Sequence, residues 1–140
     1  GTDGRKMSKS YDNAIYLKDA PEVVRAKLKP MITDPKRVRR TDPGDPDDCP
    51  VFDLHEAFSP EATREWAAAG CRTAGIGCLD CKGKLTDDLL ERVSGIHARR
   101  AELGARPDTV WYARREGAVR AREVAAHTLD DVRAAMKIKY

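Results

Sequence analysis

The sequence predicts a mainly α-helical protein, and three observations support this fold class. Aromatic residues make up only 6% of the chain, and β-branched residues are sparse beside many Ala, Leu, Arg and Glu, which are strong helix formers. Apolar residues recur at helical spacing over two long segments in the second half. No alternating strand pattern follows residue 17. A chain of 140 residues is long enough for one domain with a buried core.

A first helix is predicted to begin at Pro21, because proline favours the first turn of a helix and Asp19 or Ala20 precedes it as a cap. The segment 1–17 is expected to be a loop that becomes extended. The apolar stripe of the helix consists of Val24, Leu28 and either Met31 or Ile32.

Residues 34–50 are predicted to form a polar connector, because prolines and a glycine interrupt regular structure there. A basic block is followed by an acidic block, and pairing between the two is favoured over a binding patch. A short helix is expected over 51–58. Ser59 is expected to cap the next helix, which Gly70 ends. Its predicted core-facing side chains are Trp66 and Ala69.

Two long helices are predicted in the second half, one from Cys78 to Leu103 and one from Pro107 to about Met136, with a break allowed at Gly117. Both are expected to bury an apolar stripe, and Trp111 is expected in the core. Ten Lys or Arg stand against six Asp or Glu over residues 82–122. This excess fits either a phosphate-facing stripe or an ordinary solvated surface.

The first candidate site is the string GRKMSKS at residues 4–10. Lys6 and Lys9 supply positive charge, Ser8 and Ser10 supply hydroxyl donors, and the glycine allows close approach of backbone N–H groups to an anion. The composition favours phosphate binding, in which lysines stabilise charge that develops in a transition state. A mobile basic terminus is the alternative. The glycine pair of a Walker A loop is absent.

The second candidate site is made of the four cysteines, which are separated by 21, 6 and 2 residues. Cytosolic chains rarely form disulfides, so converging cysteines favour a metal site. Only one Cys-x-x-Cys pair is present, whereas zinc ribbons usually have two, and the surrounding glycines suit an iron–sulfur cubane. Reduced cysteines packed as small apolar residues are the alternative. The residues are Cys49, Cys71, Cys78 and Cys81.

Other features restrict the function less. His55, His97 and His127 are scattered and are interpreted as satisfied core or surface residues rather than bases. No membrane-length apolar run and no signal peptide is visible, which favours the cytosol. The sequence begins without Met and its first motif lies at the very start. We therefore expect a fragment whose other half lies upstream.

Several ordered strings together resemble the tryptophanyl-tRNA synthetases, a family of class I aminoacyl-tRNA synthetases. KMSKS alone is typical of the whole class, and the downstream strings favour the tryptophan enzymes over the tyrosine enzymes. The resemblance covers essentially the whole chain. The strings are GRKMSKSY at 4–11, DAPE at 19–22, DPGDP at 42–46, CPVF at 49–52 and CRTAGIGC at 71–78.

The resemblance implies a cytoplasmic, homodimeric tryptophan–tRNA ligase that activates tryptophan with ATP and Mg²⁺ and then charges tRNA(Trp). Residues 1–18 would be the ATP loop and the end of the catalytic domain, and 19–140 a helical anticodon-binding domain. The Rossmann domain with the tryptophan pocket would be missing, so the isolated chain is expected to be inactive. Lys6 and Lys9 would be catalytic. The implied ATP-binding residues are Lys6, Met7, Ser8, Lys9 and Ser10.

The resemblance also bears on the cysteines and on tRNA. Some bacterial members carry a [4Fe–4S] cluster on a cysteine pattern whose first gap is one residue longer than the 21 found here. We therefore expect the cluster, with zinc or no metal as alternatives. The alternative functions are a stand-alone tRNA-binding module, another class I synthetase such as the tyrosine enzyme, and an iron–sulfur sensor. The expected tRNA contacts are Arg72, Lys82, Arg99 and Arg100.

Overall fold

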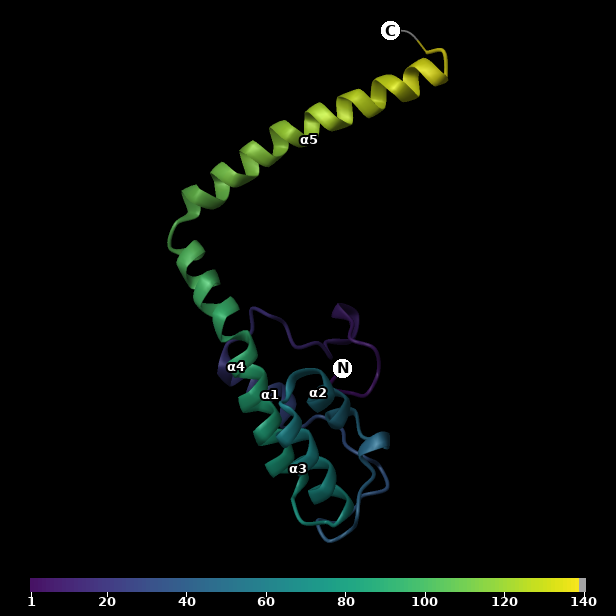
Figure 1. The fold of residues 1–140 in the computed structure, drawn as a ribbon, viewed down its shortest axis with the longest axis vertical. Coiled ribbons are helices and arrows are strands. Elements are labelled where there is room, and N and C mark those ends of the chain that lie inside the picture. The colour runs from purple at the N-terminus through teal and green to yellow at the C-terminus, as the bar shows by residue number, and fades with distance from the viewer. Residues whose placement is uncertain (139–140) are drawn as a thin grey trace. The chain divides into compact units, whose positions relative to one another are not determined.

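The computed structural model describes residues 1–138, which contain five α-helices, two 3-10 helices and no strand. The mainly α prediction is therefore confirmed. The chain divides into two compact units, Gly1–His97 and Ala98–Tyr140. The helices are α1 (Pro21–Leu28), α2 (Pro50–Phe58), α3 (Glu61–Arg72), α4 (Cys78–Gly104) and α5 (Pro107–Ala135), with 3-10 helices at Lys9–Tyr11 and Pro46–Asp48 (Figure 1).

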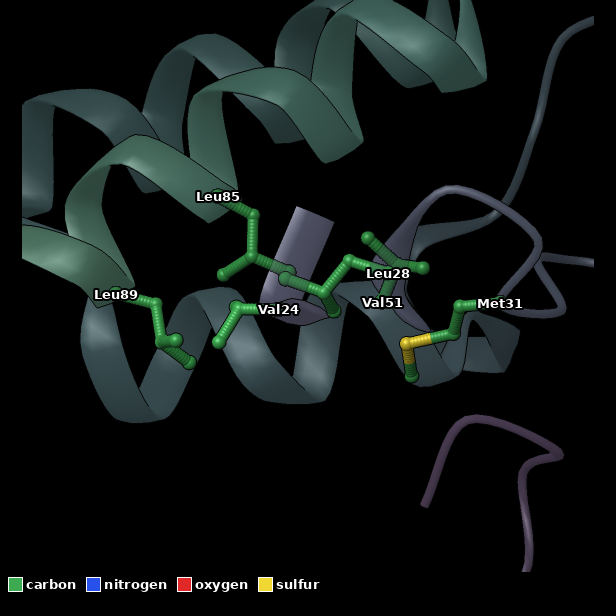
Figure 2. Packing of buried hydrophobic residues seen from close by; sticks show 6 residues of the cluster. All are labelled: Val24, Leu28, Met31, Val51, Leu85 and Leu89. Carbon is green, nitrogen blue, oxygen red and sulfur yellow. The ribbon is translucent and has the colours of Figure 1, made fainter. Parts of the chain in front are cut away.

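The first unit has an apolar core built from α1, α2 and the first half of α4. Figure 2 shows Leu85 and Leu89 of α4 beside Val24 and Leu28 of α1. Leu28 and Leu85 have no exposed surface, and burial of such a side chain contributes about 1.5–3 kcal/mol. The remaining members of the cluster are Met31 and Val51.

Helix α1 begins at Pro21 as predicted, and its end decides which residue completes the stripe. The helix stops at Leu28, so the following residues leave the helical path. The Met31 N–H then donates to the Leu28 carbonyl in a turn that carries Met31 inward, while Ile32 stays 48% exposed.

The start and the end of α3 differ from the prediction. Pro60, not Ser59, is the N-cap residue, and no side chain caps the helix. Ser59 is buried and its hydroxyl contacts His55 of α2 instead. The helix also continues through Gly70 to Arg72, because glycine raises the cost of a helical turn without forbidding it.

The buried face of α3 was also predicted wrongly. Trp66 is 41% exposed and Ala69 is exposed. Thr63 and Ala67, four residues apart, form the buried face instead. The small side chains of this helix, and not its indole, therefore face the rest of the unit.

Helix α4 begins at Cys78 as predicted and ends at Gly104, one residue beyond the predicted end, but its buried face is shorter and more polar than expected. Leu85, Leu89 and Val93 are buried, whereas Leu79 and Ile96 are 63% and 46% exposed. Three polar side chains share the buried face, namely Lys82, Thr86 and Asp88.

Helix α5 begins at Pro107 as predicted and continues past Gly117 without a break. It buries none of its side chains, and Trp111 is 55% exposed. The prediction of a buried stripe on this helix, with Trp111 in a core, is therefore wrong for this structure. Among the described residues, no helix is both long enough and apolar enough to cross a membrane.

The connector between α1 and α2 is organised by Asp34, which is buried. Its two carboxylate oxygens accept the backbone N–H groups of Lys36 and Asp45, each at 2.8 Å. These hydrogen bonds hold the pKa of Asp34 below its usual value. The predicted pairing of basic and acidic blocks is confirmed at Lys36, which forms an ion pair with Asp48.

Candidate functional site

The backbone of the opening loop is held by one buried side chain, Asn13, which is 2% exposed. Its Oδ1 accepts the Ser8 N–H at 2.8 Å, and its Nδ2 donates to Asp3 Oδ1 at 2.7 Å and to the Lys6 carbonyl at 3.2 Å. The Asn13 carbonyl accepts the Thr2 N–H at 2.9 Å. No local sequence pattern singles out Asn13, because its partners lie 5, 10 and 7 residues away along the chain.

Interactions of the Asp3 carboxylate with Asn13 and Arg5 also hold the loop in this conformation. The hydrogen bond from the Asn13 amide, followed by contacts with Arg5, lowers the pKa of Asp3 to about 2. Arg5 lies 2.6 Å from the Asp3 carboxylate, and its guanidinium lies 4.3 Å from the centroid of the Tyr11 ring. Arg5 is therefore engaged within the loop.

The functional side chains of the loop point to solvent. Ser8 caps the 3-10 helix Lys9–Tyr11, and its hydroxyl accepts the Ser10 N–H at 3.2 Å. Lys6, Met7, Lys9 and Ser10 are exposed. The arrangement thus presents two ammonium groups and a hydroxyl from a fixed backbone, which suits binding of a polyanion.

The cysteines come from three places in the first unit. Cys49 directly precedes α2, Cys71 lies in the last turn of α3, and Cys78 and Cys81 lie in the first turn of α4. A spacing of three residues places the last two on one face of α4. The connector reaches the site as well, since the Gly44 N–H donates to the Cys71 carbonyl at 3.0 Å.

The four thiols are close enough to influence one another. Burial raises the pKa of Cys81 to about 12, and Cys49, Cys71 and Cys78 each shift it in the same direction. Burial likewise raises the pKa of Cys71. Over residues 1–138, no group of three or more His, Cys, Asp or Glu side chains is arranged to hold a metal ion. Four thiolates in this space would repel one another unless a positive centre bound them.

Arg37 provides a hydrogen-bond donor beside the thiols. It is buried, its Nη2 donates to the carbonyls of Arg40 at 2.9 Å and Ile76 at 2.6 Å, and its Nη1 lies 4.0 Å from Cys71 Sγ. Its buried Nε has no partner among the described residues. Thiol ligands beside an unpaired donor fit a metal–thiolate centre of negative charge. Sequence analysis missed Arg37, which looked like one member of a basic block.

Lys82 was expected to contact tRNA, but its place in the structure argues against such a contact. Its side chain is 8% exposed, and its Nζ donates to the Lys29 carbonyl at 3.1 Å. Burial lowers its pKa, and the nearby thiols Cys78, Cys49 and Cys81 oppose that shift. The residue therefore lies under the cysteine site and joins α4 to the end of α1 instead of meeting a partner in solvent.

His55 is a further residue that the sequence did not place at this site. It is fully buried, with Nε2 3.3 Å from Cys81 Sγ and Nδ1 2.8 Å from Ser59 Oγ. Burial lowers the pKa of the imidazole. Its interpretation as a satisfied core residue is confirmed, but the contact with Cys81 joins positions 26 residues apart, so no local pattern signals it.

The other residues expected to contact tRNA lie in different units. Arg72 is in the first unit, is exposed and lies 3.9 Å from Asp47. Arg99 and Arg100 are in the second unit, where Arg99 forms an ion pair with Glu102 at 2.6 Å. These arginines are exposed, so all three can meet a phosphate in solvent.

Comparison with protein families and curated sequences gives a consistent result. Residues 1–94 match the family model described as tRNA synthetases class I (W and Y). A tryptophan–tRNA ligase of Ralstonia nicotianae is 44% identical over 100% of the chain, and one of Deinococcus radiodurans is 48% identical over 95% of it. The chain covers 35% and 41% of these relatives.

A solved structure shares the fold. The crystal structure of tryptophanyl-tRNA synthetase from Campylobacter jejuni, complexed with ADP and tryptophan, matches with a TM-score of 0.84 at 24% identity. The match covers 98% of this chain and 42% of that one. The chain therefore corresponds in fold to less than half of the solved structure.

Proposed function

The chain belongs to the class I tRNA synthetase family of the tryptophan and tyrosine enzymes, and on this premise we propose that it acts as the C-terminal part of a tryptophan–tRNA ligase. The whole enzyme would activate tryptophan with ATP and Mg²⁺ and then charge tRNA(Trp). The tryptophan enzymes are favoured over the tyrosine enzymes because relatives 44% and 48% identical over nearly the whole chain are named tryptophan–tRNA ligases.

The observation that carries this proposal is the opening loop. Its KMSKS string stands on a backbone fixed by Asn13, while the side chains of Lys6 and Lys9 are exposed. Both ammonium groups would contact the ATP phosphates and stabilise charge that develops on the departing pyrophosphate. Met7, Ser8 and Ser10 would complete the ATP-binding loop. Residues 1–18 would then be the end of the catalytic domain, and 19–140 the anticodon-binding domain.

The exposed arginines support the tRNA role. Arg72, Arg99 and Arg100 would contact the anticodon arm, mainly through phosphate groups, because guanidinium groups bind phosphate oxygens in a planar, two-pronged manner. Lys82 is omitted because of its burial. The working enzyme would be a cytoplasmic homodimer, as the family resemblance implies.

The cysteines would hold a [4Fe–4S] cluster. The donor set supports this assignment: three elements deliver four thiols to one region, beside the unpaired Nε of Arg37. A cluster in this position would tie the ends of α2, α3 and α4 together. Zinc, or thiols without metal, are the competing possibilities. The proposed ligands are Cys49, Cys71, Cys78 and Cys81.

The function is tested by ATP–pyrophosphate exchange in the full-length protein. Lys9→Ala is expected to reduce exchange by about 100-fold or more, because one charge-stabilising donor is lost from the transition state. Lys18→Ala removes another exposed lysine outside the loop and serves as the control. Tryptophan-independent exchange in the wild type, or an unchanged rate in Lys9→Ala, would contradict the proposal.

The cluster is tested separately on anaerobically prepared protein. Visible absorption together with iron and sulfide in about fourfold molar amounts would support a cubane. A colourless protein with stoichiometric zinc, or with neither metal, would remove the cluster from the proposal without affecting the role of the loop.

A further inference from the structure

We propose that the His55 imidazole donates a hydrogen bond from its Nε2–H to the sulfur of Cys81 when Cys81 ligates the cluster, and that Ser59 holds the imidazole in the tautomer this requires. The inference rests on the proposed cluster and goes beyond it, because it assigns a role to residues that are not ligands. His55 and Ser59 would act as positioning residues of the metal centre.

The geometry supports a directed contact. His55 comes from α2 and Cys81 from α4, and the atoms Nε2 and Sγ are 3.3 Å apart. The imidazole has no exposed surface, so water cannot replace this contact. The second ring nitrogen is occupied as well, because Nδ1 lies 2.8 Å from the Ser59 hydroxyl.

The chemistry of the ligand state then selects the tautomer. A coordinated cysteine is a thiolate, which has no proton to donate and only accepts. The neutral imidazole has one N–H, so Nε2 must carry it for a favourable contact with Cys81. The Ser59 hydroxyl rotates freely and can donate its proton to Nδ1. In the opposite tautomer the Nε2 lone pair would face a thiolate, which is repulsive.

The helix geometry explains why Ser59 is available for this task. His55 and Ser59 are four residues apart at the end of α2, where their side chains lie on the same face. Ser59 does not cap α3, since Pro60 is the N-cap residue and no side chain accepts there. The hydroxyl is therefore free to orient the imidazole.

Two measurable properties of the loaded protein depend on this hydrogen bond. A donor to a ligand sulfur offsets negative charge, so it stabilises the reduced cluster more than the oxidised one and raises the reduction potential. It also fixes the ligand, and loss of such a partner typically weakens metal binding by about 10–100-fold.

The test compares reconstituted wild type with His55→Leu, His55→Gln and Ser59→Ala in the full-length protein. His55→Leu is expected to lower the midpoint potential and to speed cluster loss to a chelator by about 10–100-fold. His55→Gln, whose amide N–H can replace Nε2–H, should stay closer to the wild type on both measures. Ser59→Ala should shift both in the direction of His55→Leu, by less. His97→Leu is the matched control, since His97 Nε2 lies 3.0 Å from the Leu17 carbonyl.

Each outcome has a defined meaning. If the wild type binds no cluster, the proposed cluster fails and takes this inference with it. If the wild type binds it and His55→Leu keeps the same potential and release rate, this inference alone is overturned.

A second readout is cluster assembly in variants that fold, as judged by circular dichroism. Assembly in His55→Gln but not in His55→Leu supports the donor role. Assembly in neither folded variant overturns it, because more than an N–H would be needed. If His55→Leu does not fold, Ser59→Ala is the deciding variant. A lower midpoint potential and faster cluster loss in Ser59→Ala would then support the inference, and unchanged values would overturn it.

Discussion

The opening loop and the cysteine site solve the problem of placing functional groups in opposite ways. In the loop, a buried amide at Asn13 fixes the backbone, and the side chains of Lys6 and Lys9 are left exposed. At the cysteine site, four half-buried thiols from three elements lie close enough for the other three to raise the pKa of Cys81, and Cys81 also contacts the buried His55. The loop therefore presents exposed ammonium groups to a ligand in solvent, whereas the cysteine site consists of half-buried thiols that lie near one another and near a buried imidazole.

This difference predicts different sensitivities. An exposed charged side chain contributes little to the fold, so its replacement should change binding or rate with little effect on stability. A side chain at the cysteine site contributes to packing and electrostatics and, in the proposed function, to ligation of the cluster. The two sites should therefore respond differently to equally conservative substitutions.

The largest expected effects separate the two sites by reaction step. Lys9→Ala should reduce pyrophosphate exchange by about 100-fold or more while tRNA affinity changes little. Cys78→Ser should instead weaken tRNA binding by roughly tenfold, about 1.4 kcal/mol, because the ends of α3 and α4 would lose the proposed cluster that joins them. Filter binding of tRNA and pyrophosphate exchange on the same preparations measure both. Equal losses in both assays for either variant would contradict the division of roles.

A second test concerns space around the thiols. A β-carbon at Gly44 would lie 2.7 Å from Cys71 Sγ and 3.1 Å from Arg37 Cδ. Gly44→Ala is therefore expected to destabilise the protein by about 1–3 kcal/mol and to impair assembly of the proposed cluster. Gly83→Ala is the control, since a β-carbon there meets nothing within 4 Å. Because Gly83 lies inside α4, this control should stabilise the helix by about 0.5–1 kcal/mol. Urea denaturation and iron content measure both effects.

A third test concerns the backbone of the loop. Asn13→Ala removes the acceptor for the Ser8 N–H and the donor to Asp3 and the Lys6 carbonyl. Loss of these buried hydrogen bonds should cost about 1–3 kcal/mol. It should also raise KM for ATP, because the lysines would no longer stand on a fixed backbone. Lys18→Ala, which removes an exposed side chain, should leave both quantities near their wild-type values. An unchanged KM for Asn13→Ala would show that the loop is ordered by other contacts.

The same contrast explains what the sequence could predict. Helix α4 was placed within one residue, because its apolar spacing is a local signal. The KMSKS string was recognisable because the resemblance rests on consecutive residues of the sequence. Trp66 and Trp111 were placed in a core wrongly, because hydrophobicity alone does not reveal whether another element covers a helix face.

The surroundings of the cysteines were outside the reach of local patterns for a related reason. Lys82 was assigned to tRNA by its charge and its place beside Cys81, but its ammonium group binds the Lys29 carbonyl. Arg37 and His55 reach the thiols only through the packing of the connector and α2 against α3 and α4. Pattern-based prediction therefore singled out the four cysteines but not the residues that surround them.

The smallest expected effect is a pH dependence confined to the loop. Asp3 has a folded-state pKa of about 2, below its ordinary value of 3.8, first through the Asn13 amide and then through Arg5. Because the folded pKa is the lower one, Asp3 stabilises the loop above about pH 4, and this contribution is lost as the pH falls from about 4 through about 2. Cys81 should not titrate in this range, since burial raises its pKa to about 12.

Carboxyl ¹³C NMR of the metal-free chain can follow this titration directly. The Asp3 midpoint should lie near 2 and move towards 3.8 in Asn13→Ala, which removes the first cause of the shift. Arg5→Ala should move it in the same direction by a smaller amount. A wild-type midpoint near 3.8 would mean that the amide of Asn13 does not hold Asp3 in solution. The exposed lysines would then lack the fixed backbone that distinguishes this loop from the cysteine site.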